Sequence, residues 1–379
     1  MFKIKNKKST IGVDISDLNL KAVQLVQSGH KIKIQGLSRI DLPKGIIERG
    51  QIKDKQVFIS AVHDLLTKTL FGSFNTDQIV ACLPETRSFI KLITVEKGAN
   101  PLESIIEAEI EKYVPLSASE MYYDWQIIKE QNEDYQILIG AAPQQITNQY
   151  IDALKSAKLD ITALEIEAMP ICRCLLMEES PKYNGSQDNA YGIIDIGAKR
   201  TSLIVYASNT IAFTLSMPIS GEEITEKIAN ALDINRDQAE KAKIICGLDK
   251  NNARGIIHDI LSDMIQDLTN RLIDALNYYG KNYPGWPAIK KMIVCGGGAN
   301  IKSLTEILTA ALQIEVVKGN PFINISETEE NFGKHLVEIH NIKDKKITNI
   351  NNKLSITQSA SVSYSTAIGL SLRHIFLVK

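Results

Sequence analysis

Two stretches decide the fold of this chain: Gly12-Val13-Asp14-Ile15-Ser16 and Gly192-Ile193-Ile194-Asp195-Ile196-Gly197. Each is an apolar strand that ends in an aspartate and a tight turn, and a second apolar strand follows, Leu20 to Val26 in one case and Thr201 to Tyr206 in the other. The backbone amides of such a hairpin can face an anion. The aspartate can hold a hydrated Mg²⁺, because magnesium keeps several waters and is bound through one or two carboxylates. The pair therefore predicts a polyphosphate held between two copies of one half-domain.

A third stretch, Ile293-Val294-Cys295-Gly296-Gly297-Gly298-Ala299-Asn300, is an apolar strand that runs into three glycines, and helical spacing follows from Ile301 to Leu308. Three glycines between a strand and a helix indicate close backbone approach or positive φ. A purine and its sugar can lie against such a bare turn while the helix N-terminus faces phosphate. Each stretch alone is also typical of a purely structural turn. Their combination, in this order, favours a nucleotide site.

The composition is that of a soluble globular protein with more than one core. The chain has 379 residues, of which 44% are hydrophobic and 23% charged, and this length predicts two domains or more. Because 43 Lys and Arg residues face 44 Asp and Glu residues, the net charge is −1, and no global field recruits nucleic acid or an anionic membrane. The basic stretch from Met1 to Thr10 is the local exception, and it is either a solvated tail or a weak membrane or partner contact.

We expect a cytoplasmic protein. The basic first residues run into a polar stretch and not into the apolar segment of a signal peptide, and no apolar run approaches the ~20 residues of a membrane span. The five cysteines lie in apolar segments and predict buried thiols, and the six histidines have no zinc-ligand spacing. A Gly-x-Ser-x-Gly nucleophile motif does not occur in the sequence.

The pattern of the chain changes after Pro84, and residues 86–158 are expected to form a compact inserted module. A polar linker from Pro181 to Asn189 marks a domain boundary, and residues 324–353, rich in Asn, Lys and Glu, predict a mobile loop. The module is expected to contain strand 87–95, helix 102–112, strands 122–129 and 135–142, and helix 144–157. Other helices are expected at 54–70, 221–231, 236–246, 253–281 and 365–374.

The helix expected at 102–112 is amphipathic and acidic. Its carboxylates are Glu103, Glu107, Glu109 and Glu111, and apolar residues stand between them. They form either a solvated face or an acidic rim beside an apolar groove that receives a partner peptide.

Together these segments resemble the actin-like ATPase superfamily, and within it the PilM family of type IV pilus assembly proteins, relatives of the division protein FtsA. Gly12 to Val23 is similar to the phosphate-1 loop, Gly192 to Tyr206 to the phosphate-2 loop, and Ile293 to Leu308 to the adenosine motif. Glu165 to Leu175 and Tyr364 to Arg373 resemble the two connecting helices.

The inserted module makes the resemblance to the PilM family specific, because Ala108 to Leu116, Tyr123-Asp124-Trp125 and Ile139 to Pro143 are similar to its subdomain 1C. The resemblance implies an α/β, actin-like (ribonuclease H-like) fold of two lobes, with an inserted α+β subdomain of the 1C or SHS2-like kind in the first lobe. The implied subdomains are 1A at 1–86, 159–187 and 355–379, 1C at 87–158, 2A at 188–220 and 286–354, and 2B at 221–285.

The resemblance also implies ATP or ADP with Mg²⁺ as the ligand. The residues implied to bind the cofactor are Asp14, Ser16, Asn19, Lys21, Asp195, Gly197, Lys199, Thr201, Glu240, Lys243, Gly296, Gly297, Gly298 and Asn300. Asp14 and Asp195 are the implied metal residues, acting through water, and Glu167 is the candidate for orienting a hydrolytic water. A purely structural role for Glu167 stays open.

The first hairpin departs from the family pattern. Ser16-Asp17-Leu18-Asn19 stands where the family commonly has glycine and serines, so hydroxyls that touch phosphate are missing. Asp17 adds a like charge near the phosphates, which costs on the order of 1 kcal/mol, and Lys21 and the pair Lys199-Arg200 can offset it. We therefore expect nucleotide binding with slow hydrolysis at most.

The implied function is a cytoplasmic adaptor of the pilus machine, peripheral at the inner membrane through its partners. It would bind the cytoplasmic N-terminal tail of a PilN-like protein in a groove at subdomain 1C, and other inner-membrane and motor components; self-association stays open. One alternative is an FtsA-like division filament, although the chain ends at 371–379 directly after the closing helix, without an amphipathic membrane segment. The other is a sugar or acetate kinase, for which Asp124 is the candidate base.

Overall fold

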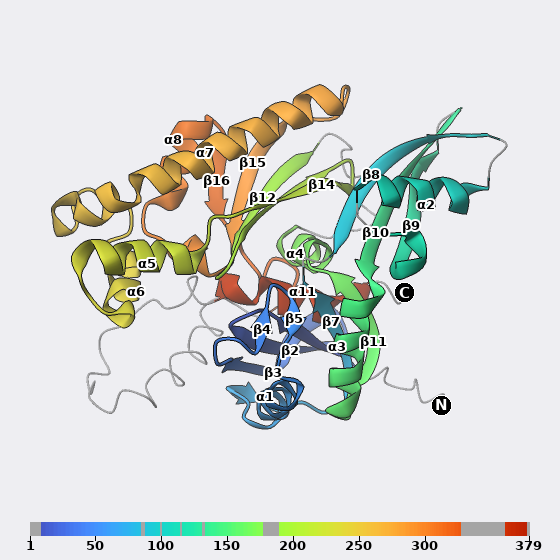
Figure 1. The fold of residues 1–379 in the computed structure, drawn as a ribbon, viewed down its shortest axis with the longest axis horizontal. Helices are drawn as coiled ribbons and strands as arrows, with labels where there is room; N and C mark the ends of the chain where they lie inside the picture. Colours follow the sequence, from blue (N-terminus) through green and yellow to red (C-terminus); the bar gives the residue numbers. More distant parts are fainter. Residues whose placement is uncertain are drawn as a thin grey trace. The chain divides into compact units, whose positions relative to one another are not determined.

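The chain forms two compact units (Figure 1). Unit 1 comprises Met1–Glu178 and Pro321–Lys379, and unit 2 comprises Glu179–Asn320. The computed structural model describes residues 9–84, 88–98, 101–113, 116–130, 133–176, 189–326 and 361–376. Residues 1–8 of the expected basic stretch, 181–188 of the expected linker and 327–353 of the expected loop lie outside the described residues. The division into four subdomains stays a prediction.

Unit 1 is built on a six-stranded sheet with the order β11-β7-β1-β2-β3-β6. Neighbours among β1, β2 and β3 are antiparallel, whereas β7 is parallel to both β1 and β11. The strands are β1 Ile11–Ile15, β2 Asn19–Ser28, β3 Lys31–Asp41, β6 Phe71–Gly72, β7 Gln78–Leu83 and β11 Asp160–Ile166. A short hairpin of β4 (Ile47–Glu48) and β5 (Gln51–Ile52) follows β3. The continuous burial of β1 is typical of a strand covered on both faces.

Helices cover both faces of this sheet. On one face, Phe58 of α1 and Tyr150 of α3 pack in one core with Val13 of β1. On the other face, Leu370 of α11 packs on Val80 of β7. The helices are α1 Lys55–Thr67, α3 Gln144–Ser156, α4 Ala168–Leu175 and α11 Ser365–Phe376, with the short helix η5 (Val362–Tyr364) before α11.

Helix α11 approaches its neighbours so closely that two positions must be glycine. A Cβ on Gly369 would lie 1.9 Å from the carbonyl oxygen of Pro170 in α4, and a Cβ on Gly12 in β1 would lie 2.2 Å from the carbonyl oxygen of Ala367. Distances this short exclude a side chain at both positions. The backbone of α11 therefore lies directly against β1 and α4.

The segment between β7 and β11 adds a second layered body to unit 1. Its strands are antiparallel in the order β8-β10-β9, and Ile106 and Ile110 of α2 pack on Ile137 and Ile139 of β10, so α2 covers one face. The elements are β8 Phe89–Glu96, α2 Leu102–Tyr113, η2 Ala118–Glu120, β9 Met121–Glu130 and β10 Asp134–Pro143. Every element expected for the inserted module is present, with bounds within two residues of the prediction.

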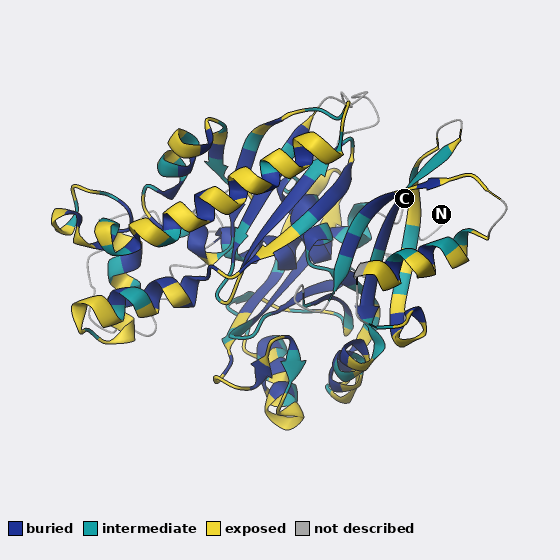
Figure 2. Ribbon diagram, turned by 45° about the horizontal axis from the view of Figure 1, so that its top comes forward, coloured by how far each residue is buried: buried dark blue, intermediate teal, exposed yellow. Residues whose placement is uncertain are grey.

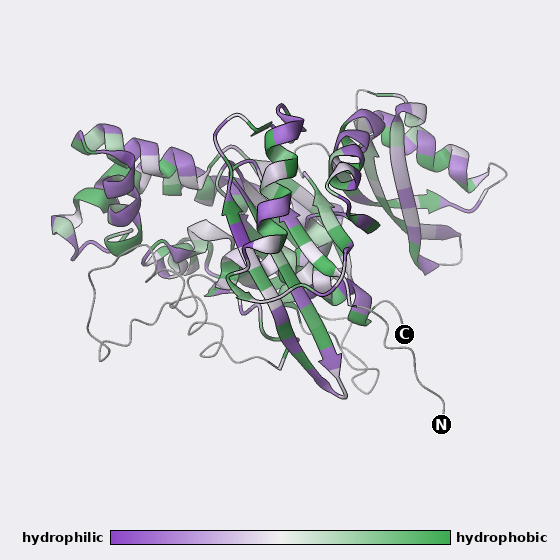
Figure 3. Cartoon of the chain, turned by 90° about the horizontal axis from the view of Figure 1, so that it is seen from below, coloured by the Kyte–Doolittle hydropathy of each residue, from purple (hydrophilic) through white to green (hydrophobic). Residues whose placement is uncertain are grey.

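Unit 2 repeats the hairpin theme of unit 1, with strands in the order β16-β15-β12-β13-β14. Its strands are β12 Ala190–Ile196, β13 Thr201–Ala207, β14 Thr210–Met217, β15 Ile289–Cys295 and β16 Glu315–Lys318. Its helices are α5 Gly221–Leu232, α6 Arg236–Ile245, η3 Ala253–Gly255, α7 Ile256–Asn282, η4 Gly297–Asn300 and α8 Leu304–Leu312. Figure 2 shows α7 with one buried and one exposed side, and Figure 3 shows hydrophobic and hydrophilic bands alternating along the helices of this unit.

We predict that Gly369→Ala destabilises unit 1 by about 2 kcal/mol or more, because the added methyl group forces α11 away from α4. Urea unfolding followed by circular dichroism measures the effect. Gly280→Ala in α7 is the matched control, since a Cβ there meets no atom within 4 Å and alanine favours a helix interior by roughly 0.5–1 kcal/mol. Equal stability of the two variants would contradict the close packing of α11.

Candidate functional site

Asp14 stands at the carboxyl end of β1, where both neighbouring strands supply it with a partner. The register of β1 and β2 puts Lys21 directly across from it, and Lys21 Nζ donates to Asp14 Oδ2 at 2.9 Å with both side chains buried. The Cys82 thiol of β7 lies 3.7 Å from Oδ1. Burial, followed by the charges of Asp14 and Glu167, raises the pKa of Cys82 well above its usual value, so the thiol keeps its proton and donates to the carboxylate.

Most polar side chains of the turn after β1 form hydrogen bonds within the protein. Ser16 Oγ donates to the Asn19 carbonyl at 2.9 Å and accepts from the Asn19 amide at 3.3 Å. Asp17 Oδ1 accepts from the Gly50 amide at 3.3 Å. The Ser16 hydroxyl, predicted as a nucleotide ligand, therefore closes the hairpin, and the extra charge of Asp17 has a donor in the β4–β5 turn.

Asn19 differs from its neighbours in this turn. Its Oδ1 is buried and has no hydrogen-bond partner among the residues that the structure describes. Rotation of the amide places Nδ2 at the same position, and a phosphate oxygen can accept from it. Asn19 thus fits the nucleotide prediction better than Ser16 does.

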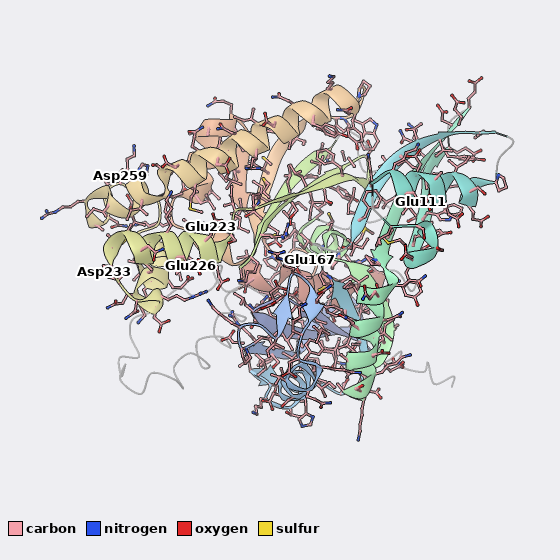
Figure 4. All side chains as sticks on the ribbon, viewed as in Figure 1. Glu111, Glu167, Glu223, Glu226, Asp233 and Asp259 are labelled. Atoms are coloured by element: carbon pink, nitrogen blue, oxygen red, sulfur yellow. The ribbon has the colours of Figure 1, made fainter. Side chains whose placement is uncertain are left out.

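Glu167 lies at the junction of β11 and α4 (Figure 4). Because β11, β7 and β1 are parallel neighbours, their carboxyl ends bring Glu167, Cys82 and Asp14 to one edge of the sheet. The Thr366 hydroxyl of α11 donates to Glu167 Oε1 at 3.4 Å. Glu167 is therefore close to Asp14, and its role in orienting water stays a prediction.

Asp195 has the equivalent place at the end of β12 in unit 2. The Cys295 thiol on the parallel neighbour β15 lies 3.6 Å from its Oδ1, which repeats the pairing of Cys82 with Asp14. Across the antiparallel ladder, however, Asp195 faces Ser202 and not a lysine. The two hairpins therefore differ in the residue that stands across from the aspartate, Lys21 in the first and Ser202 in the second.

The three glycines after β15 have different roles. A Cβ on Gly296 would lie 2.3 Å from Asp195 Oδ1, and a Cβ on Gly298 would lie 2.1 Å from the Ile196 side chain. A Cβ on Gly297 would meet no atom within 4 Å. Packing against β12 requires the outer two glycines, whereas the middle one faces open space in which a flat ligand has room.

Two residues predicted to bind the nucleotide, Thr201 and Asn300, form hydrogen bonds within unit 2. Thr201 is fully buried and its hydroxyl donates to the Ile219 carbonyl at 2.7 Å. Asn300 Oδ1 accepts from Lys318 Nζ at 3.3 Å. Thr201 therefore has no hydroxyl proton left for a phosphate.

The turn after β12 is tied to helix α5. Gly221 donates to the Gly197 carbonyl at 3.0 Å, and Lys199 forms an ion pair with Glu222 in the first turn of α5. Arg236 of α6 pairs with the same carboxylate. Burial raises the pKa of Glu222, but the hydrogen bonds and charges of Lys199 and Arg236 outweigh it and lower the pKa to about 2. Glu222 and Arg236 are not among the site residues predicted from the sequence, because no motif spacing connects them with Lys199.

Glu240 and Lys243 of α6 are brought together, but they differ in access. Lys243 is buried and donates to the Gly221 carbonyl, to Thr225 Oγ1 and to Glu240 Oε2 at 3.1, 2.9 and 2.7 Å. These three bonds use every proton of the ammonium group. The Glu240 side chain is 45% exposed. A ligand could therefore contact Glu240 directly, whereas Lys243 would contribute only by holding Glu240 in position.

A groove of about 360 Å³ opens in unit 1 on the face of the β8-β10-β9 sheet opposite α2. Its apolar walls include Leu83, Ile90, Leu138, Leu164, Ile166 and Met169. Polar groups enter it from Asp124 and Gln126 of β9, and from Glu165 and Arg373. None of the described α2 residues lines this groove, since the helix covers the other face of the sheet, so the α2 carboxylates are not the rim of this groove.

Metal-ligand clusters and membrane helices are absent from the described part of the chain. There, no three His, Cys, Asp or Glu side chains gather to hold a metal ion. Among the same residues, no helix combines the length and apolar character needed to cross a membrane.

Solved structures define the class of protein. The "PilM-PilN type IV pilus biogenesis complex" is 21% identical with a TM-score of 0.75, covering 96% of this chain and 98% of that one. The ethanolamine utilization protein EutJ from Carboxydothermus hydrogenoformans shares the fold at 15% identity and a TM-score of 0.53, covering 96% of this chain and 89% of that one. ADP-bound MreB5 of Spiroplasma citri shares it at 12% identity and a TM-score of 0.50, covering 90% of this chain and 97% of that one. The protein therefore has the actin-like ATPase fold, which confirms the sequence prediction.

The family follows from the sequence itself. Residues 12–375 match the family described as "Type IV pilus assembly protein PilM", so the chain belongs to the PilM family of type IV pilus assembly proteins. The cell division protein FtsA of Buchnera aphidicola subsp. Acyrthosiphon pisum (strain APS) is 21% identical over 383 residues, covering 85% of this chain and 86% of that protein. The resemblance to PilM is thereby confirmed, and the FtsA alternative has the weaker support.

The pKa of Glu222 predicts how stability depends on pH. A carboxylate whose pKa falls on folding, here from 4.5 to about 2, stabilises the folded state above about pH 4.5 and loses that contribution as pH falls to about 2. We expect Glu222→Gln to be less stable than wild type at pH 6 by about 1 kcal/mol, because its partners are half exposed and screened by water. At pH 2.5 most of this difference should have disappeared, since the contribution is lost as pH falls to about 2. Urea unfolding at both pH values measures this.

Glu223→Gln is the matched control for this measurement. Glu223 lies on the same turn of α5 (Figure 4) but is exposed, and the structure shows no ion pair for it among the described residues. Its substitution should leave the pH profile unchanged. If Glu222→Gln and Glu223→Gln give the same profile, the Lys199–Glu222–Arg236 cluster does not stabilise the fold.

Proposed function

We propose that this PilM-family protein is a nucleotide-binding adaptor that receives a short cytoplasmic tail of an inner-membrane partner. The observation that carries the adaptor role is the groove of unit 1. One face of the β8-β10-β9 sheet has its own helix, whereas the other opens into about 360 Å³ bounded by apolar side chains. A pocket of this size and character is typical of a ligand site. The structure of the PilM-PilN complex is similar to this chain, and a PilN-like tail is therefore the occupant that we propose.

The proposed cofactor is ATP or ADP with Mg²⁺. Asp14 and Asp195 would hold the metal through water, since each stands near the end of an apolar strand. In each case a cysteine thiol on the neighbouring strand, Cys82 or Cys295, orients one carboxylate oxygen. The residues present fit such a ligand: the buried amide oxygen of Asn19 has no hydrogen-bond partner among the described residues, and Gly297 faces open space. When bound, the nucleotide would supply the phosphate charge that the metal neutralises. Actin-like neighbours with bound nucleotide, such as ADP-bound MreB5, support the proposal.

The proposed tail site is tested by Met169→Asp. Met169 lines the groove from α4 and is partly exposed, so a carboxylate there places an unpaired charge on the apolar surface that the tail covers. We expect at least tenfold weaker binding of a synthetic N-terminal tail of the PilN-like protein from the same genome, measured by calorimetry with the full chain.

Ile127→Asp is the matched control, because Ile127 is 39% exposed on β9 but does not line the groove. It should bind the tail as wild type does. Loss of binding in both variants, or in neither, would argue against the groove as the tail site.

The proposed cofactor site is tested by Asp195→Ala. Removing the carboxylate should abolish the Mg²⁺-dependent part of nucleotide affinity, and circular dichroism should show that the variant is still folded. Titration of a fluorescent ATP analogue with Mg²⁺ and with EDTA measures this. Asp274→Ala, on the exposed side of α7, is the control. Unchanged affinity in Asp195→Ala would refute the assignment.

A further inference from the structure

The groove of unit 1 contains a charge that its own residues do not balance. Glu165 at the end of β11 is only 7% exposed and accepts from two arginines. Arg173 of α4 binds it with both terminal nitrogens, Nη1 to Oε2 at 2.8 Å and Nη2 to Oε1 at 2.9 Å. This two-pronged geometry is the strongest form of an arginine–carboxylate pair. Arg173 alone therefore neutralises Glu165.

Arg373 is the surplus cation. It comes from the last turn of α11, lines the groove, and its side chain is 36% exposed. Only its Nη1 bonds to Glu165 in the described structure; Nε and Nη2 have no partner there. A guanidinium carries five N–H donors in a rigid fork. Most of this fork is thus available at the wall of an apolar groove.

The other charge in the groove lies apart from Arg373. Asp124 of β9 lines the same groove, and its Oδ1 accepts from the amide of Trp125. No ion pair joins Asp124 to Arg373 in the described structure. Much of the groove wall is apolar, and a charge beside apolar surface is screened less than one in bulk water. The groove therefore presents an unbalanced positive charge at Arg373.

We propose that Arg373 is the specificity-determining residue of this groove, and that it reads a carboxylate on the partner. The occupant is a short peptide segment with apolar side chains for the walls and one Asp or Glu whose carboxylate takes the free edge of the Arg373 fork. Glu165 and Arg173 hold the guanidinium in position, since Glu165 fixes Nη1 and Arg173 fixes Glu165. The inference rests on the proposed function, and it adds the chemistry by which the partner is recognised.

The test combines variants of the full chain with two synthetic peptides. One peptide is the N-terminal cytoplasmic tail of the PilN-like protein from the same genome; the other has every Asp and Glu replaced by Asn and Gln, and both have an amidated C-terminus. Fluorescence anisotropy at 50 and 300 mM NaCl measures the affinities. Wild type should bind the native tail at least tenfold more tightly than the amide tail, and more so at low salt. Arg373→Gln should bind both equally weakly.

Further variants separate the hydrogen-bonding geometry of the Arg373 guanidinium from its positive charge. Arg373→Lys keeps the charge but loses the fork, so it should retain only part of the preference. Asp124→Asn removes a like charge from the groove and should tighten binding of the native tail. Lys129→Gln, on an exposed β9 residue that does not line the groove, changes the net charge as Arg373→Gln does and should leave the preference intact. Thermal unfolding confirms that each variant is folded.

The outcomes separate the two proposals. If wild type binds neither peptide, the proposed tail site itself fails. If it binds both peptides equally, or if Arg373→Gln keeps the wild-type preference, the tail site stands and the carboxylate inference is overturned. A native tail that contains no acidic residue and still binds tightly overturns it as well.

Discussion

The packing of α11 against β1 and α4 is the constraint on which unit 1 depends. Only glycine fits at positions 12 and 369, because an added Cβ would overlap a backbone oxygen of the neighbouring element at each. Ser371 adds two hydrogen bonds between the same helix and β1–β2, accepting from the Leu25 amide at 2.9 Å and donating to the Thr10 carbonyl at 3.1 Å. The helix lies more than 340 residues from these strands in sequence, so the core of unit 1 is complete only when the end of the chain has returned to it.

The duplicated hairpin explains why so much of the fold could be predicted from the sequence. A strand ending in aspartate, a four-residue turn and a return strand recur around Asp14 and Asp195, and apolar periodicity gave the helices that cover them. The parallel neighbours also match, since Cys82 and Cys295 reach the two carboxylates at 3.7 and 3.6 Å. Periodicity does not contain that pairing, because the register of parallel strands separated by long connections is decided only by the folded sheet.

The site was predicted less completely than the fold, for a physical reason. Which atom of a polar side chain is available depends on the partners that the fold gives it. Thr201 and Lys243 match the expected pattern, yet the hydroxyl proton of the first and all three protons of the second are engaged. Glu222 was missed because its importance comes from two cations on separate elements, Lys199 and Arg236, and nothing in the spacing of these residues signals their convergence.

The carboxylates of unit 1 share one support. Glu165 and Glu167 are two residues apart at the end of β11, and α11 contacts both: Arg373 binds Glu165, and Thr366 donates to Glu167. Thr366 and Arg373 are seven residues apart, about two helical turns and roughly 10 Å. Glu165 lines the groove, whereas Glu167 lies near Asp14 and Cys82 at the carboxyl ends of the strands. Because Gly12 and Gly369 pack α11 tightly against β1 and α4, one rigidly packed helix positions the partners of both carboxylates.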